Sequence, residues 1–261
     1  MSTATARPVA LVTGASVGLG EEFSRQLAAR GHDLVLVARD RARLDALAKE
    51  LEAQHSAQCE VLAADLTDAQ QLAQVEERVR TVDVLVNNAG FGTFGPFHTL
   101  DVDTETREIN LNVIALVRLT HAAASAMAER GKGGVLNVSS LASFQPGPSN
   151  ATYGATKAFV TSFTEAVHEE LKGTGVAITA LCPGFTHTEF QARADVPAGD
   201  VPGFMWQNPP EVVKAGLDGL FKNRAVVIPG GVNKVMGNVS AVTPHAITRR
   251  LGGAILKRAT H

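Results

Sequence analysis

The chain has 261 residues, which fits one large α/β domain, and its 45% hydrophobic and 19% charged residues are typical of a globular protein. Its formal net charge of -2 argues against nucleic acid as a partner. Two cysteines and eight histidines without ligand spacing argue against a disulfide framework or a metal site. Residues 1–8 do not resemble a secretory signal and no apolar stretch looks long enough to span a bilayer, so we expect a cytoplasmic protein.

Short apolar runs alternate with amphipathic stretches along the chain. The predicted strands are 9–12, 33–38, 60–63, 82–86, 135–138, 176–181 and 225–228. The predicted helices are 20–30, 41–54, 69–80, 104–129, 153–172 and 211–221. Strands rich in Val, Leu and Ile without polar alternation are buried on both faces. We therefore predict an α/β fold, a single doubly wound parallel sheet of Rossmann type with helices on both faces.

Two regions interrupt this alternation. Residues 185–208 are too long for a simple connection and form a candidate substrate lid. The C-terminal tail, about 230–261, is predicted to be irregular and then weakly helical from about 244 to 257. Its mixture of apolar and basic residues permits a helix on a membrane surface, but the favoured hypothesis is that the tail packs on its own domain or on a second subunit.

A glycine-rich turn, Thr13-Gly14-Ala15-Ser16-Val17-Gly18-Leu19-Gly20, joins the first predicted strand to the first predicted helix. Glycines let the backbone approach a pyrophosphate closely, and the helix N-terminus offers free N–H groups and the positive end of its dipole. A glycine-rich turn alone is weak evidence, but its place between strand and helix predicts a dinucleotide-binding loop.

The second predicted strand ends in Ala38-Arg39-Asp40, which bears on the choice of cofactor. An acidic residue at this strand end binds a ribose 2′-hydroxyl, whereas an arginine accommodates a 2′-phosphate. Asp40 is better explained as the N-cap of the following helix, and Arg39 can offer its guanidinium to phosphate. NADP is therefore favoured, with a solvated surface arginine as the alternative for Arg39.

Tyr153 and Lys157 are four residues apart on a predicted helix, so they project from one face. A phenol of ordinary pKa, about 10, is a poor acid–base catalyst at neutral pH, and a neighbouring ammonium is expected to lower that pKa. Tyr153 is the only tyrosine, whereas the chain has 11 phenylalanines. The spacing alone is common on surface helices, so it indicates chemistry only together with other motifs.

Together these motifs resemble the short-chain dehydrogenase/reductase family, in its ordinary short-chain branch and near bacterial ketoacyl and ketosteroid reductases. The resemblance covers about 9–190. Besides the glycine turn and the Tyr153–Lys157 pair, it rests on Asp65-Leu66, Asn87-Asn88-Ala89-Gly90, Asn110, Ser139-Ser140, and Pro183-Gly184 followed by Thr188.

The resemblance implies catalytic roles. Tyr153 would be the general acid in carbonyl reduction, and Lys157 would lower its pKa and bind the nicotinamide ribose. Ser140 would donate to the carbonyl oxygen, and Asn110 would hold a water that connects Lys157 to solvent.

The resemblance also implies a cofactor site. Asp65 would bind the adenine amino group beside Leu66, and Thr188 would cap the carboxamide, with Thr186 as a competing candidate. The implied contacts to NADP come from Gly14, Ser16, Gly18, Leu19, Gly20, Arg39, Asp65, Leu66, Asn88, Ala89, Gly90, Tyr153, Lys157, Pro183, Gly184, Thr186 and Thr188.

The loops expected at the ligand edge are rich in aromatic residues, notably Phe91, Phe94, Phe144, Phe185 and Phe190. Such walls favour a lipophilic carbonyl substrate, although they would equally form a local core. The leading hypothesis is an NADPH-dependent carbonyl reductase. An NAD-dependent alcohol dehydrogenase and a non-catalytic NADP-binding redox sensor are the alternatives. The resemblance implies a homo-oligomer, a dimer or tetramer, paired through the helices 104–129 and 153–172.

Overall fold

The structure is a computed structural model, and it describes residues 6–190 and 203–243. Seven parallel strands form one sheet in the order β3-β2-β1-β4-β5-β6-β7. Their bounds are β1 Val9–Thr13, β2 Asp33–Ala38, β3 Cys59–Ala63, β4 Val84–Asn87, β5 Gly133–Val138, β6 Val176–Leu181 and β7 Val226–Val227. The predicted doubly wound parallel sheet is confirmed, since each strand is joined to the next by a crossover that contains a helix.

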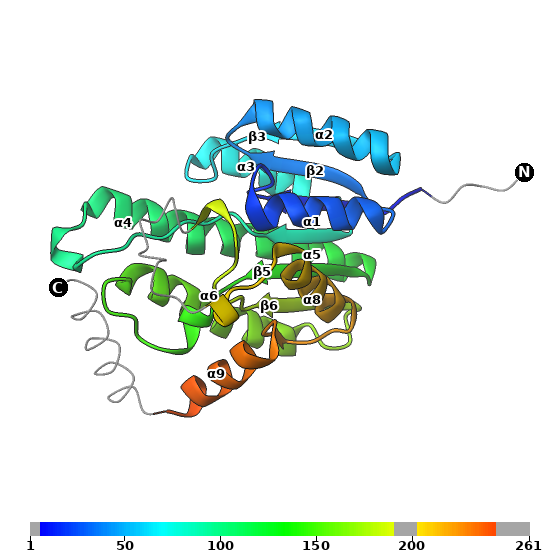
Figure 1. The fold of residues 1–261 in the computed structure, drawn as a ribbon. Coiled ribbons are helices and arrows are strands. Elements are labelled where there is room, and N and C mark those ends of the chain that lie inside the picture. The colour runs from blue at the N-terminus through cyan, green and yellow to red at the C-terminus, as the bar shows by residue number, and fades with distance from the viewer. Residues whose placement is uncertain (1–5, 191–202, 244–261) are drawn as a thin grey trace, which may run out of the picture.

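Helices cover both faces of the sheet (Figure 1). On one face, α1 (Gly18–Ala29), α2 (Arg41–His55) and α8 (Pro209–Phe221) bury side chains such as Phe23, Leu44 and Leu217 in one core cluster. On the other, α3 (Ala69–Val79), α5 (Leu116–Arg130) and α6 (Ala151–Glu170) pack around residues such as Leu119 and Met127. The remaining elements are α4 (Val102–Ile109), α9 (Gly231–Val242), the π-helical segment η2 (Asn110–Ala115) and the short 3-10 turns η1 (Phe97–Thr99), η3 (Leu141–Phe144) and η4 (Gly203–Met205).

The strand order reverses direction between β1 and β4, which are neighbours in the sheet. In open parallel sheets, ligands bind at this switch point, beyond the carboxyl ends of the strands. The glycine turn, the Asn87–Gly90 segment and Ser139-Ser140 all follow such strand ends. The topology therefore gathers the predicted motifs at one edge of the sheet.

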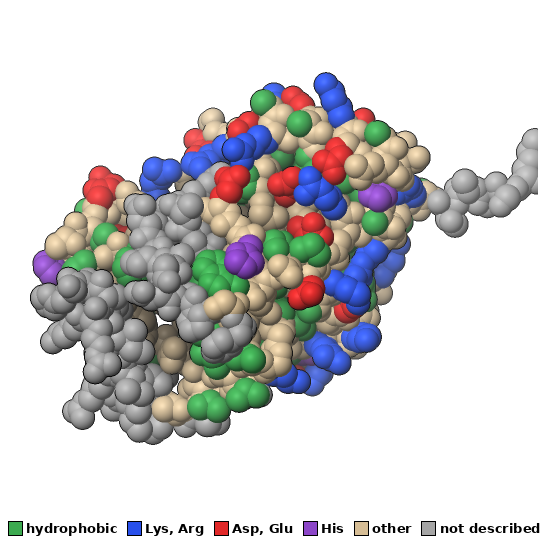
Figure 2. All heavy atoms as spheres, viewed as in Figure 1, with side chains coloured by type: hydrophobic (Ala, Val, Ile, Leu, Met, Phe, Trp, Pro, Cys, Tyr) green, Lys and Arg blue, Asp and Glu red, His purple; other side chains and the backbone are tan. Residues whose placement is uncertain are grey.

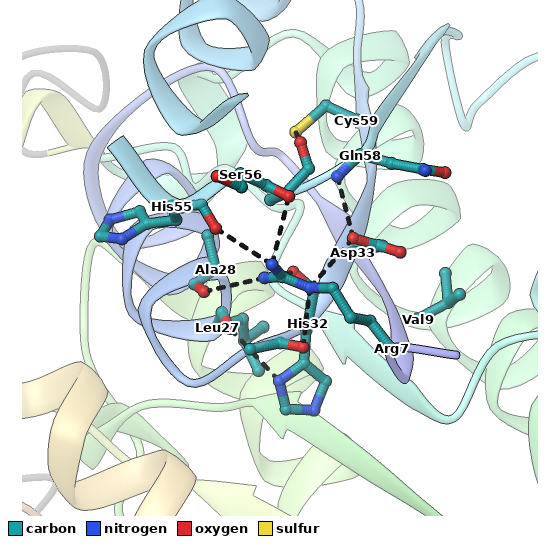
Figure 3. A network of polar contacts seen from close by, with 12 residues as sticks. Arg7, Val9, Leu27, Ala28, His32, Asp33, His55, Ser56, Gln58 and Cys59 are labelled. Carbon is teal, nitrogen blue, oxygen red and sulfur yellow. Dashed lines mark hydrogen bonds and ion pairs between the residues drawn. The ribbon is translucent and has the colours of Figure 1, made fainter. Parts of the chain in front are cut away.

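Arg7 binds the ends of the first two helices at the opposite edge (Figure 3). Its guanidinium pairs with Asp33 at 3.2 Å. It also donates to the backbone carbonyls of Ala28, Gly31, His32, His55 and Ser56. A cation is favourable beside these carbonyls because a helix C-terminus carries the negative end of the dipole.

The predicted helix 104–129 is one long run, 102–130, made of α4, η2 and α5. It is long and apolar enough to cross a membrane, with a window of mean hydropathy 1.4, so the expectation that no stretch has this length is wrong. Half of that window is buried inside the protein. The apolar character therefore fits a helix that packs on the sheet.

The tail differs from its prediction, because α9 is a regular helix where an irregular segment was expected. Gly237 packs closely on Leu141 and Phe144 of η3. The other face of α9 leaves four apolar side chains exposed, those of Val232, Val235, Met236 and Val239. Figure 2 shows hydrophobic side chains gathered over α9, whereas charged side chains of both signs mix over α1 and α2. The weak helix predicted at 244–257 lies outside the described residues.

Candidate active site

The glycine turn brings backbone very close to backbone, which explains its small residues. A Cβ on Gly20 would lie 2.0 Å from the carbonyl oxygen of Gly14, so no side chain fits there. Gly18 has a φ of +58° and faces Thr188, and this left-handed conformation favours glycine. The turn ends at Val17, the N-cap of α1, whose side chain has no acceptor for the first N–H groups of the helix. The turn therefore presents a cradle for an anion at a helix N-terminus.

Asn88 holds the cradle against the next strand. Its Nδ2 donates to the carbonyl of Thr13 at 2.9 Å, and the Thr13 hydroxyl receives the backbone N–H groups of Asn88 and Ala89. Asn87 points instead into the sheet, where it bonds Asn137 and Thr120. Of the two adjacent amides, Asn88 shapes the cofactor edge and Asn87 ties β4 to its neighbours.

At the end of β2, the adjacent residues Arg39 and Asp40 have different surroundings. The Asp40 carboxylate accepts the backbone N–H of Arg43 at 3.1 Å as the N-cap of α2, as predicted. Arg39 is exposed. Arg43, which the sequence reasoning missed, lines with Ser16 a hollow of about 270 Å³ between α1 and α2. The sequence feature that could have identified Arg43 is its position in the first turn of α2, three residues after the N-cap Asp40.

Asp65 and Leu66 follow β3 at the same edge. Burial opposes ionisation of Asp65, but its hydrogen bonds from the Thr67 N–H and hydroxyl hold its pKa below the ordinary value. Leu66 is buried against the sheet. Asp65 is therefore a half-buried anion placed where a donor group of a ligand would meet it.

Ser140, Tyr153 and Lys157 converge at the ends of β5 and α6. The Ser140 hydroxyl lies near enough to the Tyr153 phenol to favour its ionised form. The Ser140 hydroxyl also accepts the N–H of Ala142, whereas Ser139 is buried and bonds Thr161 and the Lys157 carbonyl. Lys157 is 5% exposed, and its Nζ donates to the Val138 carbonyl at 2.8 Å. The structure thus turns Ser140, and not Ser139, toward the phenol.

Burial decides the acidity of both groups. It raises the pKa of Tyr153 to about 12, while the Ser140 hydroxyl opposes the rise. It lowers the pKa of Lys157 to about 8. The predicted lowering of the phenol pKa by Lys157 is therefore wrong for this arrangement. The ammonium is 5.6 Å from the centre of the tyrosine ring and is held by a backbone carbonyl, so desolvation outweighs its effect.

The predicted Asn110 does not lie in the site. Its side chain is exposed, whereas Asn112, two residues on, is 1% exposed. Asn112 donates to the Phe91 carbonyl at 2.8 Å and to the Thr156 hydroxyl at 3.2 Å. A Cβ on Gly90 would lie 2.9 Å from its Oδ1 and 3.6 Å from Lys157 Nζ. Asn112 therefore occupies the place expected for Asn110, and the correction follows from helix periodicity, which points residue 110 to solvent.

The segment after β6 closes the site from the other side. Pro183 and Thr186 are buried, and the Thr186 hydroxyl donates to the Gly184 carbonyl at 3.1 Å. Thr188 packs over Gly18, where a Cβ would lie 3.2 Å from the Cβ of the threonine. Of the two predicted threonines, Thr188 is the one that meets the glycine turn.

An aromatic ring lies against the phenol of Tyr153, and a second aromatic pair lies on the segment after β6. Phe190 lies 5.5 Å from the Tyr153 ring, and Phe185 lies 5.7 Å from Trp206, centre to centre. The part of the predicted lid at 191–202 lies outside the described residues.

Comparison with known proteins identifies the chain. Residues 8–197 match the short chain dehydrogenase family. The chain belongs to this family of oxidoreductases. A short-chain dehydrogenase from Sphingobium yanoikuyae in complex with NADPH is 36% identical, with a TM-score of 0.81 over 97% of this chain and 95% of that one. A bulky-bulky ketone specific alcohol dehydrogenase from Comamonas testosteroni is 32% identical, with a TM-score of 0.77 over 98% and 95%.

A curated relative, the very-long-chain 3-oxoacyl-CoA reductase of Anas platyrhynchos, is 32% identical over 74% of this chain. The match spans 64% of that relative's length. This short-chain dehydrogenase also fits a nicotinamide dinucleotide on its own geometry, because the Gly14–Gly20 cradle and the N-terminus of α1, which no side chain caps, suit a pyrophosphate.

Proposed function

We propose that the chain is an NADPH-dependent reductase of bulky, lipophilic ketones. The observation that carries the proposal is the phenol of Tyr153, which lies at the cofactor edge, beside the Ser140 hydroxyl and against the ring of Phe190. Burial keeps this phenol protonated at neutral pH, as a proton donor must be.

The preference for NADPH rests on the end of β2. Asp40 already caps α2 and is engaged by its own helix, so it is not available to a ribose 2′-hydroxyl. Arg39 is exposed beside it, and Arg43 lines the hollow that contains Ser16. An exposed guanidinium at the end of β2, Arg39, favours a 2′-phosphate over a 2′-hydroxyl.

In this mechanism the bound nicotinamide cofactor supplies the hydride. Tyr153 donates its proton to the carbonyl oxygen, and Ser140 donates a hydrogen bond to the same atom as charge develops there. Lys157 would hold the cofactor ribose and places a positive charge near the phenol, and Asn112 fixes the backbone at Phe91. Exclusion of water by Phe190, which packs against the Tyr153 ring, strengthens these interactions.

The bulky, apolar substrate class is supported by the aromatic walls, and two similar proteins are named for bulky ketones and for long acyl chains. NADPH consumption should be followed with aromatic ketones, ketosteroids and long-chain 3-oxoacyl thioesters, with small polar sugars as the contrast and Tyr153→Phe as the blank. Turnover of bulky ketones is expected. Turnover confined to sugars contradicts the substrate class.

We also propose a homo-oligomer formed through the long helices. Ile109, Ile114 and Phe159 are each more than 40% exposed on α4, η2 and α6, and Phe159 stacks on Phe163. Apolar side chains exposed on adjacent helices are typical of a subunit interface. Light scattering after chromatography should give a dimer or tetramer, and Ile114→Asp should shift it toward monomer.

A further inference from the structure

One face of the α4–η2 run carries three buried polar residues, Glu105, Glu108 and Asn112. They are spaced three and four residues apart, so they lie on one side of the helix. The residues between them, including Arg107 and Asn110, are exposed. Helices of this kind normally bury apolar residues on the inner face, so this polar row requires partners.

The row faces α6 and the loop at Thr93. Glu105 accepts hydrogen bonds from the hydroxyls of Thr93 and Thr152, and Thr152 directly precedes Tyr153. Asn112 bonds Thr156, which directly precedes Lys157. Glu108 lies between them in sequence and accepts the N–H of Thr93 at 3.2 Å. Each end of the row therefore touches a neighbour of a reactive residue.

Glu108 is the unexplained member. It is 0% exposed, and its Oε1 has no hydrogen-bond partner among the described residues, although its Oε2 bonds Thr93. A buried carboxyl oxygen without a donor costs much more free energy when the group is ionised than when it is neutral. Burial and the nearby Glu105 raise the pKa of Glu108 to about 7.

The charged and titratable groups that face Glu108 are few. Glu105 lies on its own helix, and Lys157 and Tyr153 lie on α6. The loop contributes Thr93, which is uncharged. An ionised Glu108 raises the pKa of both Tyr153 and Lys157, because negative charge disfavours the phenolate and favours the ammonium.

We infer that Glu108 is a positioning residue whose proton controls the acidity of Tyr153 from behind the site. When it is neutral, the phenol is a stronger acid. When it loses its proton, the phenol holds its own proton more tightly and carbonyl reduction slows. This inference rests on the proposed reductase function, and it adds a pH dependence centred near 7, below the pKa of Lys157 at about 8.

A direct test uses the fact that Tyr153 is the only tyrosine in the chain. A ring-fluorinated tyrosine, incorporated in place of tyrosine, gives a single fluorine NMR signal for position 153 in the full chain. In the wild type we expect this signal to shift across neutral pH with a midpoint near that of Glu108, about 7. This measurement needs no substrate, so it stands even where the substrate class is wrong.

The variants separate Glu108 from its neighbour. Glu108→Gln should remove the step near pH 7 and leave the later step of Lys157, whose pKa is about 8. Glu105→Gln should keep the step of Glu108 and move its midpoint to lower pH, because a repulsive charge is lost. With an accepted ketone, kcat of the wild type should fall by about twofold to tenfold through the step near pH 7, and this fall should be absent in Glu108→Gln. A wild-type signal that does not move near neutral pH overturns the inference, as does an unchanged shift in Glu108→Gln.

Discussion

Asn112 donates a 3.2 Å hydrogen bond to the hydroxyl of Thr156, which joins the helix run at η2 to the helix that carries Tyr153 and Lys157. The π-helical turn at Asn110–Ala115 widens the helix at this point. Such turns are frequent at functional sites. The contact explains why the position of one asparagine matters to residues on another helix.

Replacement of Asn112 should therefore lower kcat. Asn112→Ala removes the bonds to Phe91 and Thr156, and we expect kcat to fall by about 100-fold, in the range of a lost catalytic contact. Asn110→Ala is the matched control, since its side chain is exposed, and it should leave kcat within about twofold. Equal losses in both variants would contradict the assignment of Asn112.

Tyr153→Phe should abolish carbonyl reduction without loss of cofactor binding. The phenol supplies the proton, so we expect kcat to fall by about 100-fold or more. The NADPH dissociation constant, measured by fluorescence titration, should change little because the ring is kept. Retained turnover in this variant would show that another group donates the proton.

Arg39→Asp should exchange the cofactor preference. It removes a cation from the 2′-phosphate and supplies an acceptor for a 2′-hydroxyl. We expect the ratio of kcat/KM for NADPH over NADH to fall by about tenfold or more, which is the effect of one charged hydrogen bond. Arg41→Asp, at the exposed first residue of α2, is the control and should leave that ratio largely unchanged.

The pH dependence of stability should carry the signature of Glu108. Its pKa of about 7 lies above its ordinary value of 4.5, so the folded protein binds an extra proton between these values. This stabilisation is complete below 4.5 and is lost as the pH rises through 7. Glu108→Gln should remove that loss, and the variant should exceed the wild type in unfolding free energy by up to about 3 kcal/mol above neutral pH.

Urea unfolding of both proteins at acidic and at mildly basic pH measures this difference. The two should differ least at the acidic value, where the wild-type carboxyl is protonated. A constant difference at all pH values would assign the effect to packing and not to ionisation.

Arg7→Ala should weaken the fold away from the site. The variant removes the ion pair of Asp33 and the guanidinium donor of five backbone carbonyls. We expect unfolding free energy to fall by about 1 to 3 kcal/mol, with kcat unchanged for the remaining folded enzyme. Arg7→Lys should recover part of the loss, because a single ammonium reaches fewer of these carbonyls.

Local pattern alone determined much of this protein. The unbroken apolar strands predicted a parallel sheet buried on both faces, and the glycine turn between β1 and α1 predicted the cradle. The four-residue spacing placed Tyr153 and Lys157 on one face of α6. These features depend on neighbours in sequence, so periodicity and turn chemistry suffice to find them.

Only the tertiary structure decided the rest. Asn110 and Asn112 are both polar residues in one helix, and which of them is buried depends on how that helix rotates against α6. The acidity of Tyr153 and Lys157 depends on desolvation by segments distant in sequence, which is the largest cause of both pKa shifts. The buried Glu105–Glu108 pair was invisible for the same reason: a carboxylate in an amphipathic helix predicts a solvent-facing side chain until packing shows otherwise.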